Sequence, residues 1–266
     1  MKILIIGKYG QLARCLDDKF IGSPEEIIFS SSEDLDISDF EKTNNKLKKI
    51  NPNIVINTSA YTAVDKAESD TDSANLINHL SVNNMAKICE EIDCSLIHIS
   101  TDYVFDGKGE RPFKENNLTN PSTVYGKTKL DGEKAILNSG CKHIILRTAW
   151  LFSCYGKNFL KTMLQLSLEK DELNIVGDQV GCPTNAHDLA KAIITIIPFL
   201  NDLKYNGIYH FGGSSSCSWA EFAEEIFNVA LTEKKIRKKP MINIINSTES
   251  SAIAKRPLNS RIDSSL

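Results

Sequence analysis

The chain has 266 residues, of which 41% are hydrophobic and 24% are charged, and its formal net charge is −3. This length suits one large domain, or one domain with a smaller lobe, and the composition is typical of a soluble globular protein. The slightly negative net charge gives no basic surface for nucleic acid, and no apolar run is long enough to span a bilayer. We therefore expect the protein to bind neither nucleic acid nor a membrane.

The seven cysteines form no Cys-x-x-Cys pair, and the five histidines show no metal-ligand spacing. Several cysteines, such as Cys89 and Cys141, lie in or beside apolar stretches, where a thiol behaves as a small hydrophobic group. We therefore expect neither a disulfide framework nor a metal site, in keeping with a reducing compartment. Met1 leads directly into a strand without a signal-peptide pattern, so we expect a cytoplasmic protein.

The first predicted element is a buried parallel strand over residues 2–6, which form a continuous apolar run. A glycine turn follows it, and apolar residues then recur at helical spacing from Leu12 to Phe20. In this order, the glycines allow close backbone approach and the helix N-terminus attracts a pyrophosphate, as in a dinucleotide site. The residues predicted to contact the cofactor here are Gly7, Gly10, Gln11 and Leu12.

The second predicted strand, over residues 26–29, ends at Ser30. Proteins that prefer NAD usually carry a carboxylate at this position to bind the ribose 2′-hydroxyl. A serine can instead donate to a 2′-phosphate, so we expect NADPH, with NADH left open as a second cofactor. The following segment is expected to pass over the adenine, which adds Asp36 and Ile37 to the cofactor contacts.

Ser38 is predicted to cap a helix over residues 39–49, and a third strand over 53–57 follows. Small residues after that strand would let a cofactor lie across the sheet edge, where the strand order reverses. The cofactor contacts expected there are Ser59, Ala60 and Tyr61. A long helix is predicted for residues 74–92.

A fourth apolar strand over residues 95–99 delivers Thr101 at its carboxyl end, and a helix opens at Tyr125 after a polar loop. Tyr125 and Lys129 are four residues apart and so share one helix face. An ammonium and an oxidised nicotinamide would lower the pKa of the phenol from its usual value of about 10. The Thr101 hydroxyl would hold a carbonyl oxygen against the phenol, which is the chemistry of hydride transfer. The alternative is a chance pair, a packed tyrosine beside a solvated lysine.

Strands alternate with helices up to a fifth strand over residues 143–147, which predicts a Rossmann-type doubly wound parallel α/β sheet. We therefore assign residues 1–150 to a cofactor-binding domain. Residues 151–266 are assigned mainly to a substrate lobe that is interleaved with the sheet, with some segments returning to it. The elements predicted there are helices over 158–169, 188–200 and 218–231 and short strands over 174–176 and 208–211.

A set of specific segments runs from one end of the chain to the other: GQLA at 10–13, LDISD at 35–39, VINTSAYTAVDKAE at 55–68, HISTDYVFDG at 98–107, NPSTVYGKTK at 120–129, LRTAWLF at 146–152, GKNFLKTML at 156–164, DQVGCPT at 178–184 and RPLNS at 256–260. These segments closely resemble the dTDP-4-dehydrorhamnose reductases, members of the extended short-chain dehydrogenase/reductase family. The glycine turn differs, because Lys8 and Tyr9 replace the small residues usual between the glycines.

The resemblance implies an NADPH-dependent reduction of the C4 keto group of dTDP-4-dehydro-L-rhamnose, which gives dTDP-L-rhamnose. Tyr125 would protonate the C4 oxygen, Lys129 would bind the nicotinamide ribose, and Thr101 would bind the reacting oxygen. Trp150 would pack on the sugar ring or only within the lobe, and Arg256 would pair with the nucleotide diphosphate. The remaining substrate contacts implied are Asp102 and Tyr103, which also shape their loop.

Two alternatives stay open beside this reaction. The first is a reductase of another nucleotide-linked 4-keto-deoxysugar, because the lobe decides the sugar. The second is a non-catalytic NADP-binding regulatory subunit, similar to that of methionine adenosyltransferase, which the unusual Lys8 and Tyr9 turn keeps open. Some relatives dimerise through magnesium-bridged carboxylates; we do not carry the metal over, and expect a monomer or a homodimer.

Overall fold

The computed structural model describes residues 1–266, and a parallel sheet of six strands forms its centre. The strand order is β10-β5-β4-β3-β1-β2, and every neighbouring pair is parallel. The strands are β1 (Lys2–Ile6), β2 (Glu26–Ser30), β3 (Ile54–Asn57), β4 (Ser95–Thr101), β5 (His143–Thr148) and β10 (Gly207–His210). The doubly wound parallel sheet predicted from the alternating pattern is confirmed.

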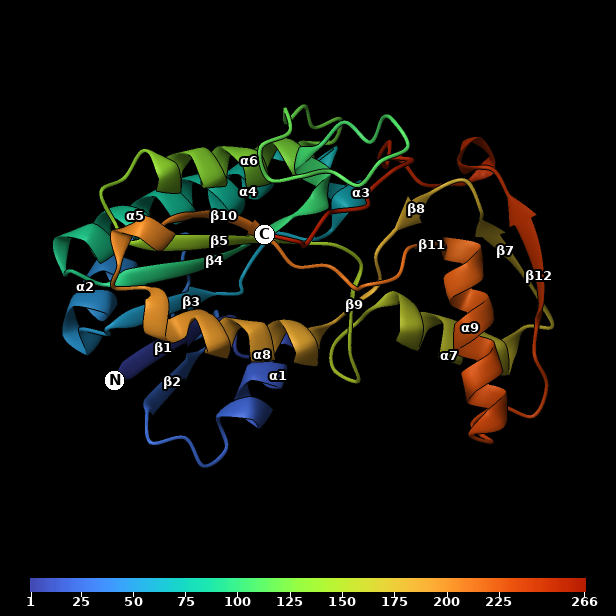
Figure 1. Ribbon diagram of the computed structural model, residues 1–266, viewed down its shortest axis with the longest axis horizontal. Helices are drawn as coiled ribbons and strands as arrows, with labels where there is room; N and C mark the ends of the chain where they lie inside the picture. Colours follow the sequence, from blue (N-terminus) through green and yellow to red (C-terminus); the bar gives the residue numbers. More distant parts are fainter.

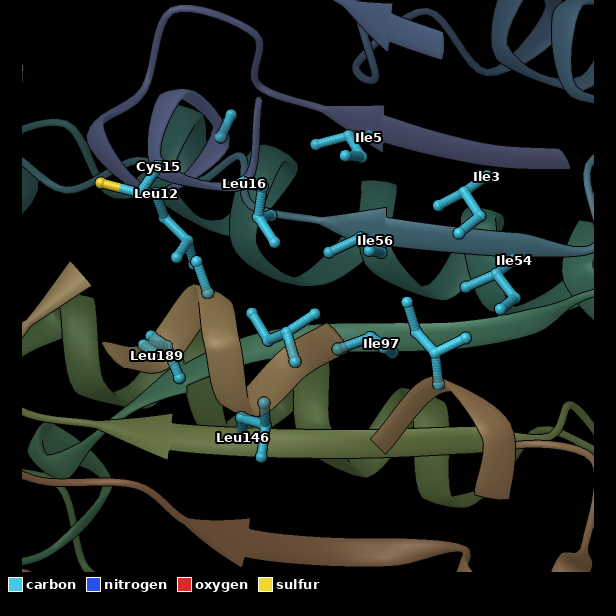
Figure 2. Close-up of a cluster of buried hydrophobic side chains, with 14 of the residues drawn as sticks. Ile3, Ile5, Leu12, Cys15, Leu16, Ile54, Ile56, Ile97, Leu146 and Leu189 are labelled. Carbon is cyan, nitrogen blue, oxygen red and sulfur yellow. The ribbon is translucent and has the colours of Figure 1, made fainter. Parts of the chain in front are cut away.

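Helices cover both faces of the sheet (Figure 1). The helices α1 (Gln11–Phe20) and α8 (Ala186–Ile196) cover one face, and α2 (Phe40–Ile50), α5 (Ser81–Glu91) and α6 (Val124–Leu137) cover the other. Successive strand residues alternate between the two cores: Ile3 and Ile5 pack toward α1 and α8, as Figure 2 shows, whereas Leu4 packs toward α2 and α5. Because both faces are covered, every residue of β1 except the first must be apolar.

The second half of the chain contributes to this sheet as well. Helix α8 packs beside α1, and β10 extends the sheet edge next to β5. Both elements were predicted, although α8 ends at Ile196 and continues as a 3₁₀ turn, Ile197–Phe199. The expected division of function at residue 150 stays a prediction.

A smaller lobe stands at the carboxyl end of the strands (Figure 1). Its helices α7 (Phe159–Glu169) and α9 (Trp219–Thr232) and its parallel strands β7 (Glu172–Val176) and β12 (Met241–Ile245) enclose a separate core of 10 buried residues. The capping box formed by Ser218 and Glu221 begins α9. Two short strand pairs join the lobe to the sheet domain: β6 (Leu151–Phe152) with β9 (Thr184–Asn185), and β8 (Val180–Gly181) with β11 (Cys217–Ser218).

The predicted cap of α2 is wrong. Asp39 caps the helix, because its carboxylate accepts from the backbone N–H of Lys42 at 3.1 Å. Ser38 instead donates from its hydroxyl to Asp36 at 2.7 Å.

The helix predicted over residues 74–92 is three segments: α4 (Thr71–Asn75), a π-helical turn (Leu76–Leu80) and α5. The π turn directs Asn78 inward, where its side chain bonds the backbone N–H and carbonyl of Tyr61 and the hydroxyl of Thr128. The remaining short helical turns are α3 (Val64–Ala67), Asp102–Val104, Leu203–Tyr205 and Ser247–Glu249.

A buried ion pair fixes α6 against the sheet. The guanidinium of Arg147 on β5 donates to both carboxylate oxygens of Glu133 on α6, at 2.9 and 2.7 Å. The hydroxyl of Ser100 on β4 donates to the same carboxylate at 2.5 Å. The side chains of both charged partners are at most 3% exposed, so either one alone would be a buried, unpaired charge.

Replacing Glu133 should therefore destabilise the fold strongly. In Glu133→Gln the amide cannot neutralise Arg147, and we expect the free energy of unfolding in urea to fall by about 3 kcal/mol. The matched control is Asp131→Asn in the exposed pair with Lys134 on the same helix, where the expected loss is under about 1 kcal/mol. Equal losses in the two variants would contradict the role given to the buried pair.

Candidate active site

A cleft of about 820 Å³ lies at the carboxyl edge of the sheet. The ends of β1, β3, β4 and β5 form one side of it, and Lys157 and Trp219 of the lobe line it as well. The carboxyl ends of parallel strands meet at one edge, so segments far apart in the sequence converge here.

The glycine turn after β1 is shaped for close approach. Gly7 has a φ of +99°, and a Cβ at this position would lie 2.7 Å from the hydroxyl of Thr58, so no other residue fits without strain. Gly10 begins α1 with no side-chain cap, which leaves the first N–H groups of the helix available. This backbone cradle fits a pyrophosphate held at a helix N-terminus.

Most of the predicted cofactor contacts line the cleft: Gly7, Gly10, Gln11, Leu12, Asp36, Ile37, Ser59 and Ala60. Ser30 and Tyr61 do not line it. Ser30 is buried and lies 3.3 Å from the ammonium of Lys46, and the Tyr61 hydroxyl donates to Asp70 at 2.9 Å. The lining of the cleft therefore does not support the predicted contacts of Ser30 and Tyr61 with the cofactor. Ser32 and Lys8 line the cleft without having been assigned as cofactor contacts.

Thr101, Tyr125 and Lys129 meet in this cleft. Thr101 is the last residue of β4, and Tyr125 is the second residue of α6, whose start is fixed by the hydroxyl of Thr123 accepting from Gly126 N–H at 3.0 Å. Lys129 follows one turn later and is only 1% exposed. The structure therefore brings together the three side chains that the sequence singled out.

The lowering of the Tyr125 pKa that was expected beside an oxidised nicotinamide stays a prediction. Burial raises the pKa of Tyr125 to about 12, and the charge of Asp102 acts in the same direction, while the Thr101 hydroxyl opposes them. Nζ of Lys129 donates to the carbonyl of Ile99 at 2.6 Å. Tyr125 is thus held as a phenol at neutral pH, the form that can donate a proton.

Asp102, next to Thr101, is almost fully buried in the cleft wall. One carboxylate oxygen accepts from the Thr101 hydroxyl at 2.9 Å, whereas Oδ2 has no partner. Burial raises the pKa of Asp102 to about 7. Tyr103 follows it and packs edge-to-face on Tyr125, with 5.6 Å between the ring centroids.

Trp150 lines the cleft and also packs against the core of the lobe, whereas its predicted contact with a sugar ring stays a prediction. Its ring stacks on Trp219 at 3.4 Å between centroids, and its N–H donates to the Ser260 hydroxyl at 3.0 Å. A Cβ on Gly181 would lie 2.3 Å from the Trp150 ring, so only glycine leaves room for this placement. Sequence reasoning missed Trp219, although the capping box at Ser218 placed it at the start of a helix.

Arg256 does not line the cleft. Its guanidinium donates to both carboxylate oxygens of Asp65, at 3.2 and 2.6 Å. The predicted contact with a nucleotide diphosphate therefore competes with this ion pair, and it stays a prediction.

No cluster of three or more His, Cys, Asp and Glu side chains is placed to hold a metal ion. No helix combines the length and the apolar composition that a membrane span requires.

The sheet, the glycine turn and the Thr101, Tyr125 and Lys129 set define the class of NAD(P)-dependent oxidoreductases of the short-chain dehydrogenase/reductase type. Within this class, the chain belongs to the family described as RmlD substrate binding domain, whose model matches residues 1–266. The resemblance drawn from the sequence segments is thereby confirmed.

Similar proteins match this chain over nearly its whole length. A dTDP-4-dehydrorhamnose reductase of Aggregatibacter actinomycetemcomitans is 39% identical over 266 residues, covering 98% of this chain and 90% of the relative. The solved dTDP-4-dehydrorhamnose reductase of Clostridium acetobutylicum superimposes with a TM-score of 0.92 at 39% identity, covering 99% of this chain and 90% of that one. That of Bacillus anthracis, solved in complex with NADP, gives 0.92 at 34% identity, covering the same shares of the two chains.

The buried carboxyl of Asp102 should make stability depend on pH. Its pKa in the folded protein is raised from 3.8 to about 7, so its contribution is fully present below pH 4 and is lost as the pH rises through 7. The neutral variant Asp102→Asn lacks this loss. The difference between its free energy of unfolding and that of the wild type should therefore shift in favour of the variant by roughly 2–4 kcal/mol between pH 4 and pH 8. Urea unfolding of both proteins at each pH measures it; a constant difference would contradict the burial argument.

Proposed function

We propose that the protein reduces the C4 keto group of dTDP-4-dehydro-L-rhamnose with NADPH and releases dTDP-L-rhamnose. One observation carries the proposal: Thr101, Tyr125 and Lys129 share a cleft with the glycine turn, in a chain of the reductase family. The relatives named as dTDP-4-dehydrorhamnose reductases match this chain over nearly its full length, which supports the same substrate.

The bound reduced nicotinamide supplies a hydride to the carbonyl carbon. The phenol of Tyr125 donates a proton to the carbonyl oxygen, and its raised pKa keeps that proton in place until the reaction. The Thr101 hydroxyl has a single hydrogen, which it donates to Asp102 in this structure at 2.9 Å. With substrate present it turns this hydrogen to the same carbonyl oxygen and so fixes the carbonyl against Tyr125. Lys129 binds the nicotinamide ribose from the floor of the cleft.

The glycine turn and the start of α1 hold the pyrophosphate, and Ile37, Ser59 and Ala60 line the path of the cofactor. We assign the NADPH preference to the end of β2. Ser32 is exposed there and lines the cleft together with Lys8, whereas the Ser31 hydroxyl is already bonded to Asp34 at 2.9 Å. A hydroxyl and an ammonium both favour a 2′-phosphate. The complex of the Bacillus anthracis relative with NADP supports this preference, with NADH as a weaker substitute.

The dTDP-linked deoxyhexulose enters between the sheet and the lobe. Trp150 lines the space open to the sugar, and Asp102 and Tyr103 form the adjacent wall. The substrate contacts named here lie within residues 101–150, whereas Lys157 and Trp219 of the lobe also line the cleft. The division into a cofactor domain over 1–150 and a lobe over 151–266 that mainly binds substrate stays a prediction.

We further propose a cytoplasmic, metal-independent protein that acts as a monomer or a homodimer. All seven cysteines are unpaired thiols, and six of them are at least partly buried, which suits a reducing compartment. The reaction above needs no magnesium, because Tyr125 supplies the proton and Thr101 the hydrogen bond to the oxygen.

Tyr125→Phe should abolish turnover. The variant keeps the ring but removes the proton, so NADPH oxidation with dTDP-4-dehydro-L-rhamnose, generated in situ and followed at the nicotinamide absorbance, should fall at least about 100-fold. NADPH binding should change little. The control Tyr205→Phe removes a hydroxyl from a 3₁₀ turn that does not line the cleft and should keep full activity.

Full activity in Tyr125→Phe would refute the assigned acid. If the wild type binds NADPH but does not turn over this sugar, another nucleotide-linked 4-keto-deoxysugar or the regulatory role becomes the better proposal. If it does not bind NADPH, the turn at Lys8 and Tyr9 is the cause.

Ser32→Asp should reverse the cofactor preference. A carboxylate at the end of β2 repels a 2′-phosphate and accepts from a 2′-hydroxyl. We expect the ratio of kcat/KM with NADPH to that with NADH to fall about tenfold or more, which corresponds to about 1.4 kcal/mol. Ser32→Ala is the control for loss of the hydroxyl alone; an unchanged ratio in Ser32→Asp would remove the 2′-phosphate from this position.

A further inference from the structure

The side chain of Gln11 reaches from the start of α1 to the segment that enters the lobe. Its Nε2 donates to the carbonyl of Leu151 at 3.2 Å. Its Oε1 lies 3.2 Å from the hydroxyl of Ser153 and 3.3 Å from Nδ2 of Asn158. These partners follow Gln11 by 140 to 147 residues and belong to one segment, residues 151–158, which connects β5 with α7.

The Gln11 amide matches the donors and acceptors around it. The carbonyl of Leu151 can only accept, so the atom facing it is Nε2, and Oε1 faces the two donors. The Ser153 hydroxyl and the Asn158 amide together supply three hydrogens. Three oxygens within reach accept them, namely Oε1 of Gln11 and the carbonyls of Ser153 and Tyr155. A side chain without an amide would leave one of these hydrogens without its oxygen and would remove the donor to Leu151.

The same segment brings a lysine to the cleft. Gly156 has a φ of +63°, and a Cβ there would lie 3.4 Å from Cβ of Gln11, so its backbone lies against the start of α1. Asn158 accepts from the backbone N–H of Lys161 at 3.0 Å and so begins α7. Lys157 stands between these two fixed residues and lines the cleft. The contacts of Gln11 therefore determine from where Lys157 reaches into it.

The ammonium of Lys157 is available to an anion. Lys157 is exposed, takes part in none of the ion pairs of the structure, and is the one cation that the lobe contributes to the lining of the cleft. An ammonium beside a phosphate forms a strong, charge-assisted hydrogen bond. The other cation considered for a diphosphate, Arg256, is already paired with Asp65.

We propose that Gln11 is a positioning residue: its amide fixes residues 151–158 so that Lys157 binds a diphosphate group in the cleft. Two diphosphates have this chemistry, the pyrophosphate of the cofactor and the diphosphate of the nucleotide sugar. Gln11 then acts twice, through its backbone at the glycine turn and through its side chain on the lobe. The inference rests on the proposed function for the identity of these two ligands, but not on turnover.

Lys157→Met tests the cation, and because Lys157 is exposed the substitution leaves the fold intact. Isothermal titration calorimetry measures the Kd of the full chain for NADP⁺, NAD⁺ and dTDP. We expect the Kd for the diphosphate that Lys157 binds to rise about tenfold, and Lys157→Arg, which keeps the charge, to retain most of the affinity. An equal loss with NADP⁺ and NAD⁺ identifies the pyrophosphate of the cofactor, whereas a loss with dTDP identifies the nucleotide sugar.

Lys161→Met is the matched control. Lys161 is an exposed lysine in the first turn of α7 that does not line the cleft. The variant carries the same change of charge close to the same place, and it should bind all three ligands as the wild type does.

A double-mutant cycle separates positioning from packing. Gln11→Met keeps the length of the side chain but removes its donor and acceptor, and it should weaken binding of the same ligand by about threefold or more. In the Lys157→Met background the same substitution should have no further effect, because Gln11 acts through Lys157. A merely structural role of Gln11 would weaken binding equally in both backgrounds.

The proposal is overturned if Lys157→Met binds all three ligands as tightly as the wild type, if its loss is confined to NADP⁺, or if the effects of the two substitutions add. The Lys157 variants decide the first two points even if Gln11→Met does not fold. Absence of turnover in the wild type would instead count against the proposed function, because the binding titrations do not depend on it.

Discussion

The cost of burying polar groups at the carboxyl end of β4 is the constraint on which this structure depends. β4 lies in the middle of the sheet, so its side chains have no access to water and must find partners on the helix that covers them. His98 contacts Lys129 and Ser100 contacts Glu133, so two alternate residues of the strand bind two residues one turn apart on α6. These contacts fix α6 across the sheet and thereby place Tyr125 at the sheet edge.

The same burial acts on every titratable group of the site, and it favours the neutral form each time. It raises the pKa of Tyr125 and of Asp102 and lowers that of Lys129. Burial is the largest influence on Tyr125 and keeps it a phenol that can act as an acid.

The sequence was sufficient for the features that local pattern determines. Apolar runs located the strands of the sheet, and the glycine turn and the spacing of Tyr125 and Lys129 located the site. It failed where a partner from a distant part of the chain decides. Arg256 was assigned to a ligand because Asp65 is 191 residues away in sequence, and Trp219 became part of the cleft only through its stack on Trp150. The cap of α2 failed for a local reason, because two adjacent residues, Ser38 and Asp39, are both good caps.

The stack of Trp150 on Trp219 has an optical consequence. These are the only two tryptophans in the chain, and they come from opposite sides of the cleft, one following β5 and the other opening α9. All indole fluorescence therefore originates at the junction of the two lobes, from a pair of parallel rings in van der Waals contact. Emission from this protein reports on this junction rather than on the average state of the chain, with no need for an added label.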